Sequence, residues 1–278
     1  RGKFFFFFFF EEQVIRLVPT LALTGSEASW GQAARKGIEL AIEEDNSSGG
    51  INGKKLQALF EDFGEFDLKR AASAAQKFAG IDQAAAILTL WSEDTEVVWP
   101  IASRNNLVTL SIAAGSKDLT KNRKLLFRVW PSDELMIDAV VSYAKKLNAK
   151  KAAVIYQQTA YHENLGKLAA ASWKQAYGQD LKLYAVNQSD AEFRTILTRI
   201  KASGADVLFI QTAYGILGTI LKESAQIGIK ALRFGTVGSA EDPQVIQASG
   251  GNANGLISPR YKPAINEFVD RFRARFFE

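Results

Sequence analysis

Side chains suited to holding a small molecule recur just after apolar segments of this sequence. Ser92 directly follows Trp91, Trp30 stands near the end of the first such turn, and Tyr161 and Tyr214 follow apolar runs in the second half. A small-molecule pocket is built from flat apolar walls and a few placed hydrogen-bond donors. These five residues therefore predict a non-covalent binding site.

The segment that begins at Ser92 leaves the charge of its ligand open. Ser92 starts a predicted helix, where its hydroxyl either caps the helix or, with free backbone N–H groups, holds a ligand carboxylate. Glu93 and Asp94 oppose a bare anion because they already place negative charge at the positive end of this helix. They could instead face an ammonium group, and the sequence does not decide between the two.

The residue inventory argues against enzymatic chemistry. The chain has no cysteine and a single histidine, His162, so disulfides and thiol nucleophiles are excluded and a zinc site built on histidines is all but excluded. Neither Gly-x-Ser-x-Gly nor Gly-x-Gly-x-x-Gly occurs, and Gly49–Lys55 lacks the Walker spacing. We expect a protein that is not an enzyme and that uses no cofactor and no metal.

Length and composition describe an ordinary folded protein with more than one domain. The 278 residues are 47% apolar and 23% charged, as is typical of globular chains. At about 100–200 residues per domain, this length suits two lobes. The net charge of +4 is scattered and basic runs with interleaved aromatic residues do not occur, so we expect no nucleic-acid binding.

The first ten residues carry a basic pair followed by seven consecutive phenylalanines. This order is similar to a secretory signal, but the apolar run is at the lower limit of length and no small-residue cleavage site follows it. A membrane-spanning helix needs about 20 residues. We interpret Arg1–Phe10 as a tag, a signal remnant or an artefact, with no intact signal peptide, and leave it out of the fold.

Strands and helices are expected to alternate from Val14 to Phe276. This alternation predicts an α/β fold in which each lobe is a parallel sheet flanked by helices. In open parallel sheets, ligands bind outside the carboxyl ends of the strands, which is where the aromatic and hydroxyl residues lie. The expected strands are 14–23, 56–61, 84–90, 107–110, 151–156, 181–186, 206–211, 232–234 and 256–258. The expected helices are 31–45, 67–79, 94–104, 132–147, 161–176, 192–203, 217–227 and 265–276.

Two runs of alternation meet near residues 119–131. We assign 11–121 to the first lobe, 122–248 to the second and 249–278 to a return into the first lobe.

Several segments point to one family. The most specific is Gly49-Gly-Ile-Asn-Gly-Lys-Lys-Leu56, which follows Trp30-Gly31-Gln32 at matching spacing; Pro131-Ser-Asp-Glu134 and Lys150-Lys-Ala-Ala-Val-Ile-Tyr156 continue the likeness. In these segments, and over nearly all of 14–276, the chain resembles the branched-chain-amino-acid-type periplasmic binding proteins. These are the type I substrate-binding proteins of ABC importers, with a two-lobed periplasmic-binding-protein-like fold.

The resemblance implies a periplasmic or extracytoplasmic monomer whose two lobes hinge shut on one small ligand, which a membrane permease then receives. It also implies site roles: Trp30 as an aromatic wall, the Ser92 hydroxyl on a ligand carboxylate, the Ala113 carbonyl on a ligand ammonium, and Tyr161 and Tyr214 as contacts from the second lobe. A ligand-sensing domain of a receptor or regulator shares this fold and is the alternative function.

Two departures from the family's pattern bear on the ligand. Gly115 stands where amino-acid binders carry Thr or Ser, with Ser116 the nearest hydroxyl, and Val237 stands where they carry the acid that pairs with the ligand ammonium. An ammonium without a partner in a closed site is costly. A standard amino acid thus requires another acid, and an aromatic or aliphatic carboxylate is the competing ligand. The acids that could pair with the ligand ammonium, in place of the one that Val237 replaces, are Glu93, Asp94 and Glu241.

The chain also ends earlier than members of the family.

Overall fold

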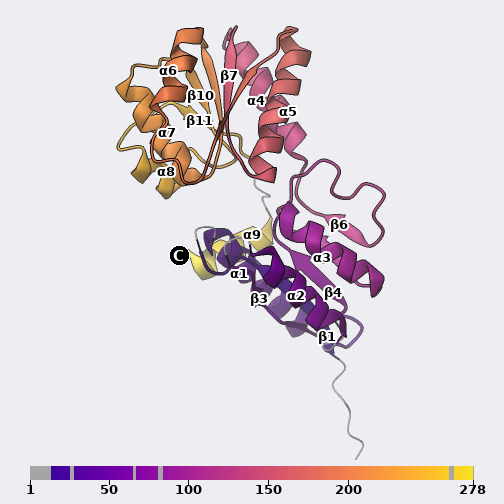
Figure 1. Ribbon diagram of the computed structural model, residues 1–278. Helices are drawn as coiled ribbons and strands as arrows, with labels where there is room; N and C mark the ends of the chain where they lie inside the picture. Colours follow the sequence, from indigo (N-terminus) through magenta and orange to yellow (C-terminus); the bar gives the residue numbers. More distant parts are fainter. Residues whose placement is uncertain (1–13, 26–27, 65–66, 81–83, 263–265, 278) are drawn as a thin grey trace, which may run out of the picture. The chain divides into compact units, whose positions relative to one another are not determined.

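A computed structural model describes residues 14–25, 28–64, 67–80, 84–262 and 266–277, so the Arg1–Phe10 segment lies outside the described residues. The chain forms two compact units and passes between them after Pro131 and after Pro263 (Figure 1). Sequence prediction placed these divisions after residues 121 and 248. They fall later because β6 (Leu126–Arg128) extends the first sheet and β11 (Leu256–Ile257) extends the second.

Unit 1 contains a parallel sheet with the strand order β2-β1-β4-β5-β6, and β3 pairs with the carboxyl end of β1. Val18 of β1 pairs with Ile87 of β4, and both side chains are fully buried with Phe63 and Phe78 in one core cluster. The elements of unit 1 are β1 (Val14–Leu21), α1 (Ala28–Ser47), β2 (Lys55–Ala58), β3 (Glu61–Asp62), α2 (Leu68–Gly80), β4 (Ala86–Thr89), α3 (Ser92–Arg104), β5 (Val108–Ser111), β6 and α9 (Glu267–Phe276).

Unit 2 contains a second parallel sheet, with the strand order β11-β10-β9-β7-β8. Helices α4 and α5 cover one face of this sheet, and α6, α7 and α8 cover the other (Figure 1). The elements are α4 (Asp133–Lys146), β7 (Ala152–Gln157), α5 (Ala160–Tyr177), β8 (Lys182–Val186), α6 (Arg194–Ser203), β9 (Val207–Gln211), α7 (Tyr214–Gln226), β10 (Leu232–Phe234), α8 (Pro243–Ala248) and β11.

Strand β9 shows why unit 2 needs helices on both faces. All of its residues are buried. Because successive side chains of a strand point to opposite faces, Phe209 packs with α4 and α5, where the fully buried Trp173 meets it edge-on at 5.9 Å. Ile210 packs with α6 and α7 on the other side. Full burial of such a side chain contributes about 1.5–3 kcal/mol. The predicted fold class, a helix-flanked parallel sheet in each half, is confirmed.

Apart from β3, which the sequence predicted only as the end of one strand over 56–61, two short elements were not predicted from the sequence. Strand β6 has three residues and no periodic pattern, and its Phe127 is 55% exposed. Helix α8 has six residues, too few to show helical periodicity, although Asp242 accepts a hydrogen bond from the Gln244 N–H and Pro243 is its first residue. Aspartate followed by proline is a typical helix start, and it was the signal available.

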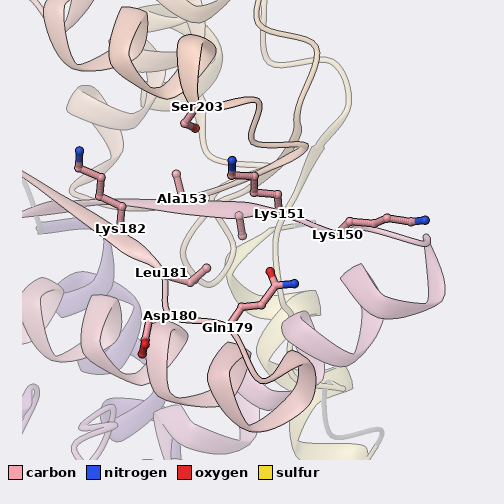
Figure 2. Close-up of a pocket in the computed structure, with 9 residues that line it drawn as sticks. Lys150, Lys151, Ala153, Gln179, Asp180, Leu181, Lys182 and Ser203 are labelled. Atoms are coloured by element: carbon pink, nitrogen blue, oxygen red, sulfur yellow. The ribbon is translucent and has the colours of Figure 1, made fainter.

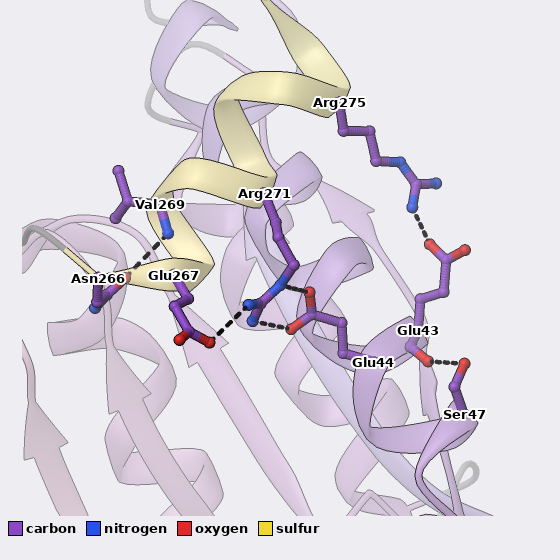
Figure 3. A network of polar contacts seen from close by, with 8 residues as sticks. All are labelled: Glu43, Glu44, Ser47, Asn266, Glu267, Val269, Arg271 and Arg275. Carbon is purple, nitrogen blue, oxygen red and sulfur yellow. Dashed lines mark hydrogen bonds and ion pairs between the residues drawn. The ribbon is translucent and has the colours of Figure 1, made fainter.

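Helix α9 returns the chain to unit 1 and contacts α1 through two ion pairs (Figure 3). Arg271 binds both carboxylate oxygens of Glu44, at 2.5 and 3.0 Å, and Arg275 binds Glu43. No residue of α9 is buried. The hydrogen bond from Arg271 lowers the pKa of Glu44. This attachment is therefore present above the ordinary pKa of Glu44 and is lost as the pH falls through the lowered value.

We expect the backbone amides of α9 to exchange hydrogen for deuterium faster than those of α7, which has one face buried. Replacing Arg271 with Gln should speed exchange in α9 by about twofold to fivefold, because exposed ion pairs contribute little each. Exchange detected by mass spectrometry checks this. The exposed Arg273 is the matched control, since Arg273→Gln removes the same charge without breaking the Glu44 pair. Equal exchange in the two variants would contradict the proposed attachment.

Candidate ligand-binding site

The turn from β4 into α3 is fixed by a buried carboxylate. Asp94 accepts hydrogen bonds from the N–H groups of Leu90 (2.8 Å) and Trp91 (2.6 Å). Next to it, the Thr95 hydroxyl lies 2.6 Å from that of Thr89. Burial raises the pKa of Asp94 to about 7, although the two backbone donors act in the opposite direction. This turn is thus a rigid platform at the carboxyl end of the first sheet.

The pH dependence of stability should carry the signature of Asp94. Its pKa is about 3.8 unfolded and about 7 folded, so between these values the folded state binds the extra proton and stability falls as the pH rises. Above the folded value this contribution is constant. Urea denaturation of the wild type and of Asp94→Asn, from pH 4 to pH 7, measures it. We expect a shallower fall in the variant, and parallel curves would contradict the assignment.

Ser92 is joined to the loop that follows β5. Its hydroxyl oxygen accepts a hydrogen bond from the Ser116 N–H (3.2 Å), and the Ser116 carbonyl accepts one from Arg128 (2.6 Å). Ala113 and Gly115, in the same loop, are buried. The capping alternative for Ser92 is wrong: Trp91 occupies the cap position and Ser92 is the first helical residue. Unit 1 thus brings Ser92 together with Ser116 in the 113–116 loop.

Three tryptophans meet in unit 1. The ring centroids of Trp30 and Trp91 are 5.3 Å apart at an interplanar angle of 64°, and those of Trp30 and Trp130 are 6.2 Å apart at 77°. All three side chains are half-buried. Sequence reasoning named Trp30 and Trp91 but missed Trp130, which follows a strand that was not predicted. Its position directly before Pro131 was the one available signal.

The predicted residues of unit 2 lie where its strands end. Tyr214 is the first residue of α7, and its hydroxyl donates to the Val237 carbonyl in the loop after β10 (2.9 Å). Tyr161 lies near the start of α5 and packs against His162, with ring centroids 5.2 Å apart. The structure therefore joins Tyr214 to Val237 by a hydrogen bond. Tyr214 packs against the core cluster between the sheet and helices α6 and α7, whereas Tyr161 and Val237 pack against the cluster between the sheet and helices α4 and α5.

His162 lies in the first turn of α5 and contacts the residue that caps this helix. Thr159 caps the helix by accepting the His162 N–H at 3.3 Å, and its hydroxyl lies 2.8 Å from Nδ1 of the ring. Burial lowers the pKa of His162 to about 4, so the imidazole is neutral near pH 7. Within the described ranges, no group of three or more His, Cys, Asp or Glu side chains is placed to hold a metal ion.

The three acids that could pair with a ligand ammonium differ in their availability. Both oxygens of Asp94 accept backbone hydrogen bonds, and both oxygens of Glu241 bind Arg260, at 2.8 and 2.9 Å. Glu93 is half-buried, and burial raises its pKa, which disfavours the charged form. The carboxylates of Asp94 and Glu241 are therefore already occupied by contacts within the protein.

A separate hollow of about 670 Å³ lies in unit 2 at the amino ends of β7 and β8 (Figure 2). Lys151 and Lys182 reach toward the side of Ser203, whereas Lys150 points away from it. None of the residues predicted for the site lines this hollow. Since parallel-sheet proteins bind ligands at the carboxyl ends of strands, we do not assign the ligand to it.

Comparison with known proteins agrees with the fold. The profile of the family described as periplasmic binding protein matches residues 15–278. The Leu/Ile/Val-binding protein homolog 3 of Brucella melitensis is 27% identical over 91% of this chain and 70% of its own length. A leucine-binding protein of Thermotoga maritima superposes with a TM-score of 0.84 at 22% identity, covering 95% of this chain and 77% of its own.

Two further solved structures differ in their ligands. The branched-chain amino acid binding protein of Streptococcus pneumoniae, in complex with isoleucine, has a TM-score of 0.80 at 23% identity and covers 96% of this chain and 78% of its own. A solute-binding protein of Rhodopseudomonas palustris, in complex with 3,4-dihydroxybenzoic acid, has a TM-score of 0.78 at 20% identity and covers 95% and 74%.

The chain belongs to the periplasmic binding protein family. This membership confirms the predicted resemblance, the predicted role as a solute-binding protein of an ABC importer and the predicted extracytoplasmic location. Members of this family are binding proteins for transporters. None of the helices in the described part of the chain has the length and apolar character needed to cross a membrane.

Proposed function

We propose that this chain binds a small carboxylate and presents it to the membrane permease of an ABC importer, acting as a monomer and without enzymatic activity. The observation that carries the ligand class is the state of Ser92. Its oxygen accepts the Ser116 N–H, which leaves the hydroxyl hydrogen to donate. It also lies in the first turn of α3, where backbone N–H groups lack partners within the helix.

The relatives support a carboxylate but differ in the remainder of the ligand. Isoleucine and 3,4-dihydroxybenzoic acid, named for two of the solved structures, share a carboxylate and differ in the ammonium group. A structural neighbour from Thermomonospora curvata is described as a fatty acid binding protein. The carboxylate is therefore the ligand group on which the proposed function depends.

We propose that both units contribute to this ligand. Unit 1 supplies Trp30, Trp91, Ser92 and the 113–116 loop with Ala113, Gly115 and Ser116, and unit 2 supplies Tyr161, Tyr214 and Val237. The support is their shared position at carboxyl ends of strands. Closure of the two units on the ligand, which the family resemblance implies, stays a prediction.

A thermal-shift screen tests the proposed function. The purified chain is melted with amino acids, aromatic acids, short fatty acids and, as neutral controls, the matching amides. A ligand at 100 times its Kd stabilises the folded state by about 2.7 kcal/mol, which raises the melting temperature by roughly 5–10 °C for a domain of this size. We expect one class of acid to shift the melt and its amide not to. If none of the acids or amides raises the melting temperature, the proposal is overturned.

A further inference from the structure

Unit 1 presents a rigid aromatic surface that the carboxylate alone does not explain. We call Trp30, Trp91 and Trp130 the tryptophan corner. Trp91 and Trp130 are both steeply inclined to the Trp30 ring, at 64° and 77°. Each residue is only half-buried, so part of its surface remains accessible.

The backbone of each member of the corner is fixed. Trp91 donates its N–H to Asp94 and accepts the Thr95 hydroxyl at its carbonyl (2.5 Å). The residue before Trp130 is tied to β5, because the Val129 N–H donates to the Ser111 carbonyl (3.1 Å). The residue after Trp30 is Gly31, which packs directly on Ala22. Backbone held in this way needs little further ordering when a ligand binds.

Inclined rings favour a flat aromatic partner over a branched aliphatic one. Aromatic rings attract each other in edge-to-face and offset-stacked arrangements, beyond the area that they bury. A ring placed in the corner can meet one tryptophan by its face and another by its edge. An aliphatic side chain gains only the burial of its surface.

The acids proposed as partners of a ligand ammonium do not favour that group. The oxygens of Asp94 are occupied by the N–H groups of Leu90 and Trp91, and burial raises the pKa of Glu93, which disfavours its charged form. In unit 2, Val237 is apolar and its carbonyl accepts the Tyr214 hydroxyl. A ligand with a carboxylate and no ammonium avoids leaving a positive charge without a free carboxylate partner.

We propose that the ligand is an aromatic carboxylate without an α-ammonium group, and that Trp130 is a specificity-determining residue that extends the aromatic wall formed by Trp30 and Trp91. This inference rests on the proposed function, since it names the substrate class of the same site.

Calorimetric titration of the full chain with benzoate, 4-hydroxybenzoate, isoleucine and hexanoate tests the substrate class. Whichever of benzoate and 4-hydroxybenzoate binds more tightly should bind at least about tenfold more tightly than isoleucine or hexanoate. Tighter binding of isoleucine or hexanoate would overturn this inference and leave the proposed function intact. If none of the four binds and the thermal-shift screen is also negative, the proposed function itself fails.

Substitution of Trp130 tests its role. Trp130→Leu should weaken benzoate binding by about threefold to tenfold, the range expected for one aromatic contact, and should change hexanoate binding less. Trp130→Phe keeps an aromatic ring and should lose less benzoate affinity than Trp130→Leu. It also provides a test if the leucine variant folds poorly. The control is Trp99→Leu, because Trp99 bonds the Lys124 carbonyl and stacks on Arg123, away from the corner. Unchanged benzoate affinity in folded Trp130→Leu, or an equal loss in Trp99→Leu, would overturn the role of Trp130.

Discussion

Replacing Gly31 with Ala should destabilise the protein by about 2–4 kcal/mol, as expected for an overpacked contact that side-chain movement cannot relieve. A Cβ atom at residue 31 would lie 1.9 Å from the carbonyl oxygen of Ala22 and 2.5 Å from its carbonyl carbon. Both are backbone atoms at the end of the first strand, so α1 itself would have to move. The loss follows from how closely α1 packs there.

The same helix offers a matched control. At Gly37, a Cβ atom would meet only the Phe272 ring, at an ordinary 4.0 Å. Alanine is the better helix former, so Gly37→Ala should stabilise by up to about 1 kcal/mol. Urea denaturation of both variants at one pH measures the two effects. Equal stabilities would show that α1 does not approach Ala22 as the structure has it.

Replacing Ser92 with Trp should abolish ligand binding without unfolding the chain, with a loss of at least about 100-fold in affinity, as for a truncated or blocked hot spot. The indole would remove the hydroxyl that bonds the Ser116 N–H and would fill the space beside the 113–116 loop. Because Ser92 is the first residue of α3, the helix and its Asp94 cap are expected to survive.

The control for Ser92→Trp is the same substitution at the other end of the helix. Ser103 lies in the last turn of α3, and its hydroxyl donates to the Pro100 carbonyl (3.4 Å). Ser103→Trp should keep the wild-type affinity for the acid that shifts the melt. Retained affinity in a Ser92→Trp variant with a wild-type circular dichroism spectrum would refute the placement of the ligand.

Much of the fold follows from local patterns that the sequence carries openly. Strand β9, with apolar residues at every position, and the helices beside it have the expected type and nearly the expected bounds. The division between the units was harder, because it depends on β6. Three residues with an exposed Phe127 carry no pattern of their own, and their strand character comes from pairing with β5.

The candidate site was likewise predictable only in part from the sequence. That Ser92 and Ser116 meet follows from the parallel order of β4 and β5, which places their following loops side by side. The occupation of Asp94 and Glu241 could not be predicted, because it depends on hydrogen bonds within a tight turn and on an arginine nineteen residues away. Trp130 was missed because its neighbours in space come from distant parts of the chain.

We propose that the ligand binds residues at the carboxyl ends of strands in both units. Hydrogen–deuterium exchange with and without the acid that most raises the melting temperature tests it directly. We expect slower exchange in residues 89–95 and 111–116 of unit 1 and in residues 157–162, 212–214 and 235–239 of unit 2. The hollow at residues 150–153 and 179–182 should exchange as before. Protection confined to that hollow, or to one unit alone, would contradict the proposed binding site.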